Sequence, residues 1–291
     1  IVSGAVKHVA EAATWLGYTY YFARMLRSPK LYGVTPAMID EDPILNKHRE
    51  NLIHSAASIL DQHGLLHYDR VTGAFQATEL GRIASYYYIT IDSVAAFNNM
   101  LSPTMDDIGL FRLFSSSYEF RNVVVRSEEK LELKRLLQRV PIPVKEDLEN
   151  ASAKINVLLQ AYISRLKLDG YALLSDMVYI QASAGRIMRA IFEMVIMRGW
   201  ADLAKRVLKL SNMIERRMWG SQCPLRQFPS GSINKDILTS LEKKSLAWPR
   251  YFDLEPYDLG ELVRRPGFGR KLYSFVHKFP KLELSAQIQP I

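Results

Sequence analysis

Three observations on the sequence predict a mainly α-helical chain that is made of three successive parts. Two short strand-like runs flank Thr72-Gly73, between segments with helical periodicity. Residues 92–220 then have a helical pattern throughout, and a glycine-rich turn at 266–269 joins two later helices. Helices, a two-stranded wing and a further helix are the order of a winged-helix domain. The predicted fold is therefore a winged helix followed by a helical bundle and a small helix-hairpin-helix domain.

We assign residues 1–91 to the winged helix, although a generic α+β segment has the same order of elements. Helical periodicity extends over 5–27, and a second helix is expected from Asp42 to just before Gly64. Thr78 is the predicted N-cap of the helix that follows the wing. Winged helices often bind nucleic acid, but many only dock against neighbouring domains. The fold alone therefore leaves the function open.

Residues 92–222 are predicted to form the helical bundle, whose longest helix spans about 175–198. One face of this helix is apolar and is expected in the core: Ile180, Ala184, Ile187, Ile191 and Val195. Arg186 and Arg189 share another face because they lie three residues apart. That face is either solvated, with Arg189 paired to Glu193, or the wall of a semi-buried channel. Arginines on such a wall suit phosphates, which they bind through two parallel hydrogen bonds.

A segment rich in proline, serine and glycine, CPLRQFPSGSIN, marks the predicted boundary before the third part. Residues 233–279 then form a small helical unit around the turn that contains Gly267 and Gly269. These glycines would let a ligand approach the backbone, and the next helix would present unpaired N–H groups to a phosphate. Arg270 and Lys271 would add positive charge. A plain turn between two packed helices has the same pattern.

The composition limits the class of protein. The chain has 291 residues, 48% of them hydrophobic, which is enough to bury a sizeable core. A formal net charge of +8 favours an anionic partner: nucleic acid, an acidic protein or an anionic membrane surface. Cys223 is the only cysteine, which excludes an intrachain disulfide and a cysteine-rich zinc site and indicates a reducing compartment. The longest apolar runs are too short to span a membrane.

No motif for catalysis is present. The sequence has no G-x-x-x-x-G-K-[ST] phosphate loop, so this chain alone is not expected to hydrolyse ATP. It has no paired catalytic constellation, and its histidines do not have the spacing of metal ligands. We therefore expect no catalytic residue and no metal site in this segment.

These parts, in this order, resemble the C-terminal half of a cassette of the large superfamily-two RNA helicases. The segments that carry the likeness are WLGYTYYFARMLRSPKLYGV, TELGRIASYYYIT, EEKLELKRLLQRVPIPVKE, SAKINVLLQAYISRLKLDGYALLSDMVYI, SAGRIMRAIFE, RGWADLAKRVLKL and RMWGSQCPLRQF. They span nearly the whole chain and are together more specific than any single motif. The likeness is greatest to spliceosomal members of the family, in their amino-proximal, active cassette.

The resemblance implies roles that composition does not show. In this family the long bundle helix lies across two motor domains, is called the ratchet helix, and lines the channel for single-stranded RNA. This implies RNA contact for the matching residues Gln181, Ser183, Arg186 and Arg189. The family's helix-hairpin-helix domain also contacts the strand, which implies the same for Gly267, Gly269, Arg270 and Lys271. Residues 280–291 resemble the start of an immunoglobulin-like domain.

The family's two motor domains are missing from this chain, so the resemblance assigns ATP and magnesium to them and no cofactor to this segment. It implies a nuclear, ATP-dependent RNA helicase that unwinds paired small nuclear RNAs during spliceosome activation. This chain would be its accessory RNA-guiding module, with the motor domains of the same polypeptide and other spliceosome core proteins as partners, and no membrane. The alternative is a protein-docking scaffold from an inactive cassette or a related translocation-type protein.

Overall fold

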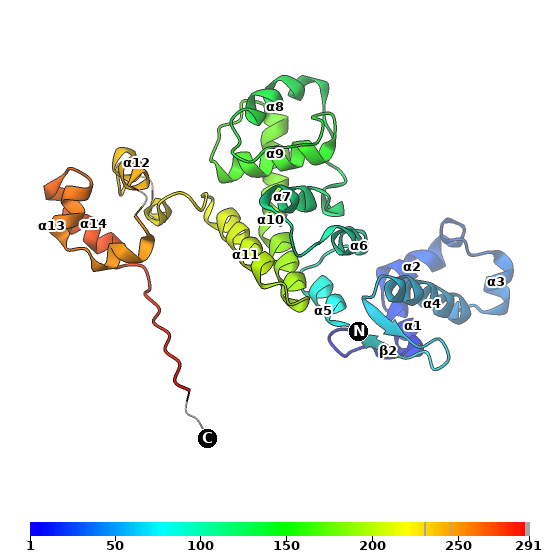
Figure 1. Cartoon of the computed structure of the whole chain (residues 1–291). Helices are drawn as coiled ribbons and strands as arrows, with labels where there is room; N and C mark the ends of the chain where they lie inside the picture. Colours follow the sequence, from blue (N-terminus) through cyan, green and yellow to red (C-terminus); the bar gives the residue numbers. More distant parts are fainter. Residues whose placement is uncertain (230, 245, 289–291) are drawn as a thin grey trace. The chain divides into compact units, whose positions relative to one another are not determined.

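A computed structural model describes residues 1–229, 231–244 and 246–288 (Figure 1). The chain divides into two compact units, Ile1–Tyr162 with Leu166–Ile214, and Ile163–Arg165 with Glu215–Ile291. Within the described residues, one two-stranded sheet accompanies a series of helices, so the predicted mainly α fold is confirmed. No helix in the described part of the chain is both long and apolar enough to cross a membrane.

The first unit begins with the winged helix. Its elements are α1 (Val9–Gly17), α2 (Tyr20–Arg27), η1 (Pro29–Tyr32), α3 (Pro36–Glu41), α4 (Asn46–Gln62), β1 (Leu66–Tyr68), β2 (Phe75–Ala77) and α5 (Glu79–Tyr86). The predicted hairpin is confirmed, since β1 and β2 pair antiparallel with Leu66 opposite Ala77. Gly73 has φ 77°, the left-handed conformation that the turn needs. Thr78 caps α5 as expected, by accepting a 3.0 Å hydrogen bond from the Gly81 N–H.

Two predicted helices in this domain have other boundaries, and one short helix was not predicted. The helix expected over 5–27 is two helices, because Thr19 accepts a 3.3 Å hydrogen bond from the Phe22 N–H and caps the start of α2. The helix expected from Asp42 begins only at Asn46, after Leu45 at φ 54°. The short helix α3 was not predicted, although Thr35 followed by a proline is an N-cap signal.

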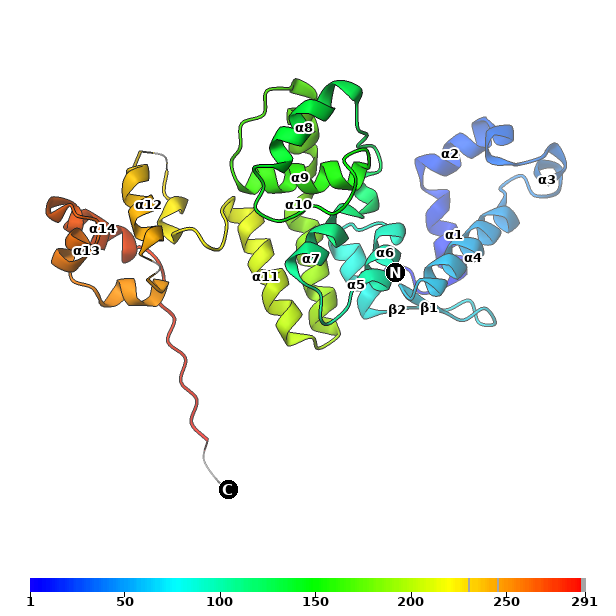
Figure 2. The same ribbon diagram turned by 45° about the horizontal axis from the view of Figure 1, so that its top comes forward.

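The rest of the first unit is the helical bundle, shown from a second direction in Figure 2. Its elements are α6 (Ile91–Met100), α7 (Asp107–Ser115), η2 (Tyr118–Phe120), η3 (Ser127–Glu129), α8 (Lys130–Leu137), α9 (Ala151–Ile163), α10 (Tyr171–Met197) and α11 (Ala201–Arg216). Every residue of α9 from Ala153 to Ala161 is buried, so α9 is the central helix of the bundle. The predicted apolar face of α10 is confirmed, because its five residues are at most 1% exposed.

The second unit contains η4 (Pro224–Gln227), α12 (Lys235–Lys243), η5 (Trp248–Asp253), α13 (Pro256–Leu262), η6 (Pro266–Phe268) and α14 (Gly269–Val276). The segment expected to be a linker contributes Cys223, Leu225 and Ile233 to the core of this unit. The Arg226 guanidinium also forms two hydrogen bonds, of 2.6 and 2.8 Å, to the Glu242 carboxylate on α12. Residues 280–288, part of the segment that resembles the start of an immunoglobulin-like domain, have no assigned secondary structure; 289–291 lie outside the described residues.

Cys223 provides a chemical test of this packing. Burial raises the pKa of its thiol to about 11. Because the thiolate is the reactive form, we expect iodoacetamide to alkylate the folded protein at pH 8 roughly 100-fold more slowly than an unperturbed cysteine. Mass spectrometry of the peptide that contains Cys223 measures the rate. Alkylation at the rate of a free thiol in the folded protein would show that the segment is not packed as described.

Candidate nucleic-acid interface

Arg186, on the long helix α10, is fixed to the end of α5. Its Nη1 donates a 2.6 Å hydrogen bond to the carbonyl of Tyr87 and a second bond to the carbonyl of Tyr88. These carbonyls follow the last residue of α5, and Tyr88 leaves the helix at φ 51°. Carbonyls at a helix C-terminus lack partners within the helix and lie at the negative end of its dipole. A guanidinium is therefore well suited to this position.

The two carbonyls occupy only one nitrogen of the Arg186 guanidinium. Among the described residues, its other edge has one long contact, 3.4 Å from Nη2 to Ser183 Oγ. Arg186 and Ser183 are both half-buried, and the helical spacing of three residues brings them together. The edge formed by Nε and Nη2 can still donate two parallel hydrogen bonds to a phosphate, with the Ser183 hydroxyl beside it.

A second contact joins the same two helices. The Tyr87 hydroxyl donates a 2.5 Å hydrogen bond to the Glu193 carboxylate on α10. Burial and this hydrogen bond together raise the pKa of Tyr87 to about 12. Tyr87 therefore stays protonated and remains a donor at neutral pH. In the sequence Tyr87 belongs to an aromatic run, Tyr86-Tyr87-Tyr88, for which a core or interface role is favoured over base stacking, but its partner Glu193 could not be predicted because it depends on where α5 ends relative to α10.

The other two predicted residues of α10 differ in exposure. Gln181 is half-buried, and Arg189 is exposed. Glu193, which we considered as an ion-pair partner of Arg189, accepts the hydrogen bond from Tyr87. The structure thus brings Ser183 and Arg186 into one cluster, and it places Gln181 and Arg189 on the same helix outside that cluster.

The glycine turn differs from the expectation in one respect. Gly269 is buried, and a Cβ at this position would lie 1.8 Å from the Pro256 carbonyl oxygen. This glycine therefore permits close packing of α13 against α14, and not the approach of a ligand. The N–H groups of Phe268 and Gly269 already donate to the carbonyls of Arg265 and Pro266, because η6 continues directly into α14. These two amides are therefore not available to a phosphate.

The remaining predicted residues of the turn are accessible. Gly267, Arg270 and Lys271 are exposed, and a Cβ on Gly267 would meet no atom within 4 Å. The Lys271 ammonium lies 5.6 Å from the centre of the Phe268 ring. Any phosphate contact at this turn would therefore use side chains. These residues belong to the second unit, whereas Arg186 belongs to the first.

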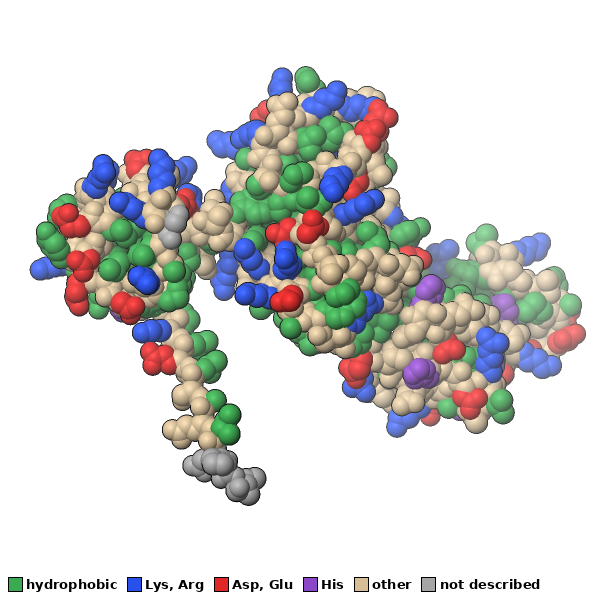
Figure 3. Space-filling view, viewed as in Figure 1, with side chains coloured by type: hydrophobic (Ala, Val, Ile, Leu, Met, Phe, Trp, Pro, Cys, Tyr) green, Lys and Arg blue, Asp and Glu red, His purple; other side chains and the backbone are tan. Residues whose placement is uncertain are grey.

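A third basic surface lies over α11. Figure 3 shows lysine and arginine side chains there, interspersed with acidic ones. A groove of about 520 Å³ between α11 and the start of α7 is lined by Lys205, Arg206, Lys209, Asp107 and Asp202, among others. Arg206 lies 3.9 Å from the Asp107 carboxylate. The mixed charges make this groove less suited to a polyanion than the Arg186 site. In the described part of the chain, no cluster of three or more His, Cys, Asp or Glu residues could hold a metal.

The fold defines a helical module with several parts. These are a winged helix, a bundle that contains one long arginine-bearing helix, and a small helical hairpin unit. Comparison with known protein families agrees with this class. Residues 77–291 match the Sec63 Brl domain, and residues 1–62 match a winged helix-turn-helix domain. The chain belongs to the Sec63 Brl domain family.

Relatives match the chain over its whole length. A U5 small nuclear ribonucleoprotein 200 kDa helicase of Drosophila melanogaster is 57% identical over all 291 residues, which span 14% of that protein. The human protein of the same name is 55% identical, also over 14% of its length. The Arabidopsis thaliana DExH-box ATP-dependent RNA helicase DExH12 is 58% identical, over 13% of its length. The chain therefore spans about one seventh of each of these relatives.

Proposed function

We propose that this chain is an accessory RNA-guiding module of an ATP-dependent RNA helicase, and that α10 is its ratchet helix. The module grips single-stranded RNA against motor domains while the helicase unwinds paired small nuclear RNAs during spliceosome activation. The observation that carries this proposal is Arg186, whose guanidinium is held on one side by two carbonyls and has a second edge available to a phosphate. Contacts of this kind bind the RNA backbone without selecting a sequence.

The similarity to the U5 and DExH-box helicases supports this proposal. ATP and magnesium belong to motor domains outside this chain, and we place the whole protein in the nucleus with other spliceosome core proteins.

In this proposal residues 1–91 are the winged helix, residues 92–222 are the ratchet bundle, and residues 233–279 are the helix-hairpin-helix domain. An immunoglobulin-like domain begins at about 280. Gln181, Ser183, Arg186 and Arg189 contact RNA in the first unit. In the second unit the side chains of Arg270 and Lys271 provide the contacts, at the turn that contains Gly267 and the buried Gly269.

The test is binding of labelled single-stranded RNA to the full-length protein that contains this chain, across a salt series. We expect Arg186→Ala to weaken binding about tenfold, because a hydrogen bond to a charged group contributes roughly 1.5–3 kcal/mol. The slope of log affinity against log salt should fall by about 0.7, the value for one lost phosphate contact on a single strand. Arg186→Lys keeps the charge but cannot bind a phosphate through two parallel bonds, so it should also weaken binding.

The matched control is Arg135→Ala, which removes an exposed arginine from α8 in the same unit. It should leave the affinity unchanged. A thermal melt of each variant checks that loss of the α5 contact has not unfolded the bundle. Unchanged RNA affinity in a folded Arg186→Ala variant would contradict the proposal.

A second candidate function is a protein-docking scaffold. The winged helix exposes several large aromatic side chains, which favours a protein partner: Trp15, Tyr18 and Tyr20 are 61%, 87% and 77% exposed. If neither Arg186→Ala nor Arg270→Ala affects RNA binding, the scaffold becomes the better account of the chain.

A further inference from the structure

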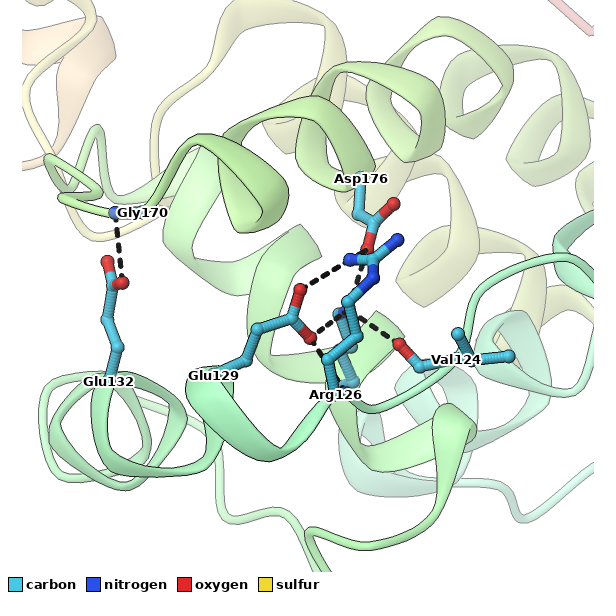
Figure 4. A network of polar contacts seen from close by, with 7 residues as sticks. Val124, Arg126, Glu129, Glu132, Gly170 and Asp176 are labelled. Carbon is cyan, nitrogen blue, oxygen red and sulfur yellow. Dashed lines mark hydrogen bonds and ion pairs between the residues drawn. The ribbon is translucent and has the colours of Figure 1, made fainter.

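Four charged side chains meet between α8, α9 and α10. Lys154 on α9 is fully buried, and its ammonium lies 2.5 Å from the Glu129 carboxylate and 2.6 Å from the Asp176 carboxylate on α10. It also donates a 2.8 Å hydrogen bond to the Val124 carbonyl. Arg126 binds the same two carboxylates from the exposed side, at 2.5 and 3.1 Å. Figure 4 shows Arg126, Glu129 and Asp176 pointing toward one another from different segments.

The ionisation of the group fits this arrangement. Burial alone would raise the pKa of Glu129, but the hydrogen bonds from Lys154 and Arg126 outweigh burial and hold the pKa below its usual range. Glu129 is therefore ionised at neutral pH. The three donors of Lys154 are all used, by Glu129, Asp176 and Val124.

A further acidic residue, Glu132, binds the backbone at the start of α10. The Glu132 carboxylate on α8 accepts hydrogen bonds from the N–H groups of Asp169 and Gly170, at 2.7 and 3.0 Å. Gly170 is the N-cap residue of α10 and has no side chain to cap the helix. Glu132 thus fixes where α10 begins, and Asp176, six residues further on, fixes how the helix is rotated.

Stability alone does not explain a buried cluster of this kind. Desolvation of the charges offsets much of their attraction, and apolar side chains of similar size often stabilise a core equally well. The best-attested effect of buried polar groups is to select one register of packing over others. Apolar contacts tolerate small rotations of a helix, whereas an ammonium with three acceptors does not.

We propose that the Lys154–Glu129–Asp176 cluster sets the rotation of α10, and thereby the direction in which Arg186 faces. Lys154 is a positioning residue in this scheme and does not touch RNA. The inference rests on the proposed RNA contact of α10. A rotation of roughly 20° about the helix axis moves an atom about 5 Å from the axis by nearly 2 Å, which is enough to break a hydrogen bond.

The test compares three variants of the full-length protein. Lys154→Met alone leaves Glu129 and Asp176 without their buried partner. The triple variant Lys154→Met, Glu129→Gln, Asp176→Leu removes the buried charges together, while Arg126 can turn to solvent. Arg186→Ala reports on the RNA contact itself. Cryo-electron microscopy shows the orientation of α10 relative to α9, and thermal unfolding and single-stranded RNA affinity are measured for each variant.

We expect the triple variant to recover most of the unfolding midpoint lost by Lys154→Met, but with α10 rotated. Its RNA affinity should be reduced about as much as that of Arg186→Ala, on the order of tenfold. An α10 that superposes on the wild-type helix in the folded triple variant would overturn the inference, whatever the RNA affinity. If α10 rotates but neither variant affects RNA binding, the positioning role stands and the proposed RNA function fails.

Discussion

Lys154→Met should lower the free energy of unfolding of the first unit by about 3 kcal/mol at pH 7, because the buried Glu129 carboxylate loses its buried partner and keeps only Arg126 on the exposed side. Lys154 is 0% exposed and Glu129 only 3%, so water cannot replace the lost ammonium. Urea unfolding followed by tryptophan fluorescence or circular dichroism measures the loss. The control is Lys130→Met: Lys130 forms an exposed ion pair with Glu149, and we expect a change below about 1 kcal/mol.

The effect of Lys154→Met should depend on pH. In the wild type the pKa of Glu129 is depressed, so its contribution to stability is present above the usual carboxyl pKa and is lost as the pH falls through the folded-state value. Lys154→Met removes the largest of the contacts that lower this pKa, although the hydrogen bonds from Arg126 remain. The pKa of Glu129 should therefore be higher in the variant than in the wild type, so that acid protonates Glu129 sooner and relieves the penalty. The stability difference between wild type and variant should therefore be largest at neutral pH and shrink toward pH 4. A difference independent of pH would contradict this account.

Gly269→Ala should destabilise the second unit by about 3 kcal/mol, in the upper part of the range for overpacking a core. The new Cβ would lie 1.8 Å from the Pro256 carbonyl oxygen and 3.0 Å from the Gly260 nitrogen, both backbone atoms that cannot rotate away. The helices α13 and α14 would have to separate. Urea-dependent alkylation of Cys223, which lies in the core of this unit, measures the change.

Gly267→Ala is the matched control, because it adds the same methyl group two residues earlier, where no atom lies within 4 Å. Stability should change by less than about 0.5 kcal/mol. If both variants unfold at the urea concentration of the wild type, the close packing of the two helices is not as described.

The sequence was sufficient to predict elements with strong local signals. The pair Thr72-Gly73 predicted the hairpin, and Thr78 predicted the start of α5. The spacing of Ile180, Ala184 and Ile187 predicted the buried face of α10. Helix boundaries failed where a residue took an unusual conformation, as Leu45 does before α4. No periodicity rule identifies such a residue in advance.

The candidate site could be predicted only in part. The spacing of Arg186 and Arg189 placed them on one face, but the partners of Arg186, Tyr87 and Tyr88, lie almost 100 residues away in the chain. Lys154 was missed for the same reason, although one signal was available. It is a lysine within the apolar run AKINVLLQA, and a charge in a helix that is buried on all sides needs an ion-pair partner.

The burial of α9 on all sides also constrains the order in which the protein can fold during synthesis. The ribosome completes α9 at Ile163, but α10, whose Asp176 contacts Lys154 on α9, ends only at Met197. Until then Val157, Leu158 and Leu159, which are fully buried in the finished bundle, have only part of their packing. A nascent chain that stalls between α9 and the end of α10 therefore exposes a strongly apolar helix, the kind of surface that chaperones bind and that aggregates when left uncovered.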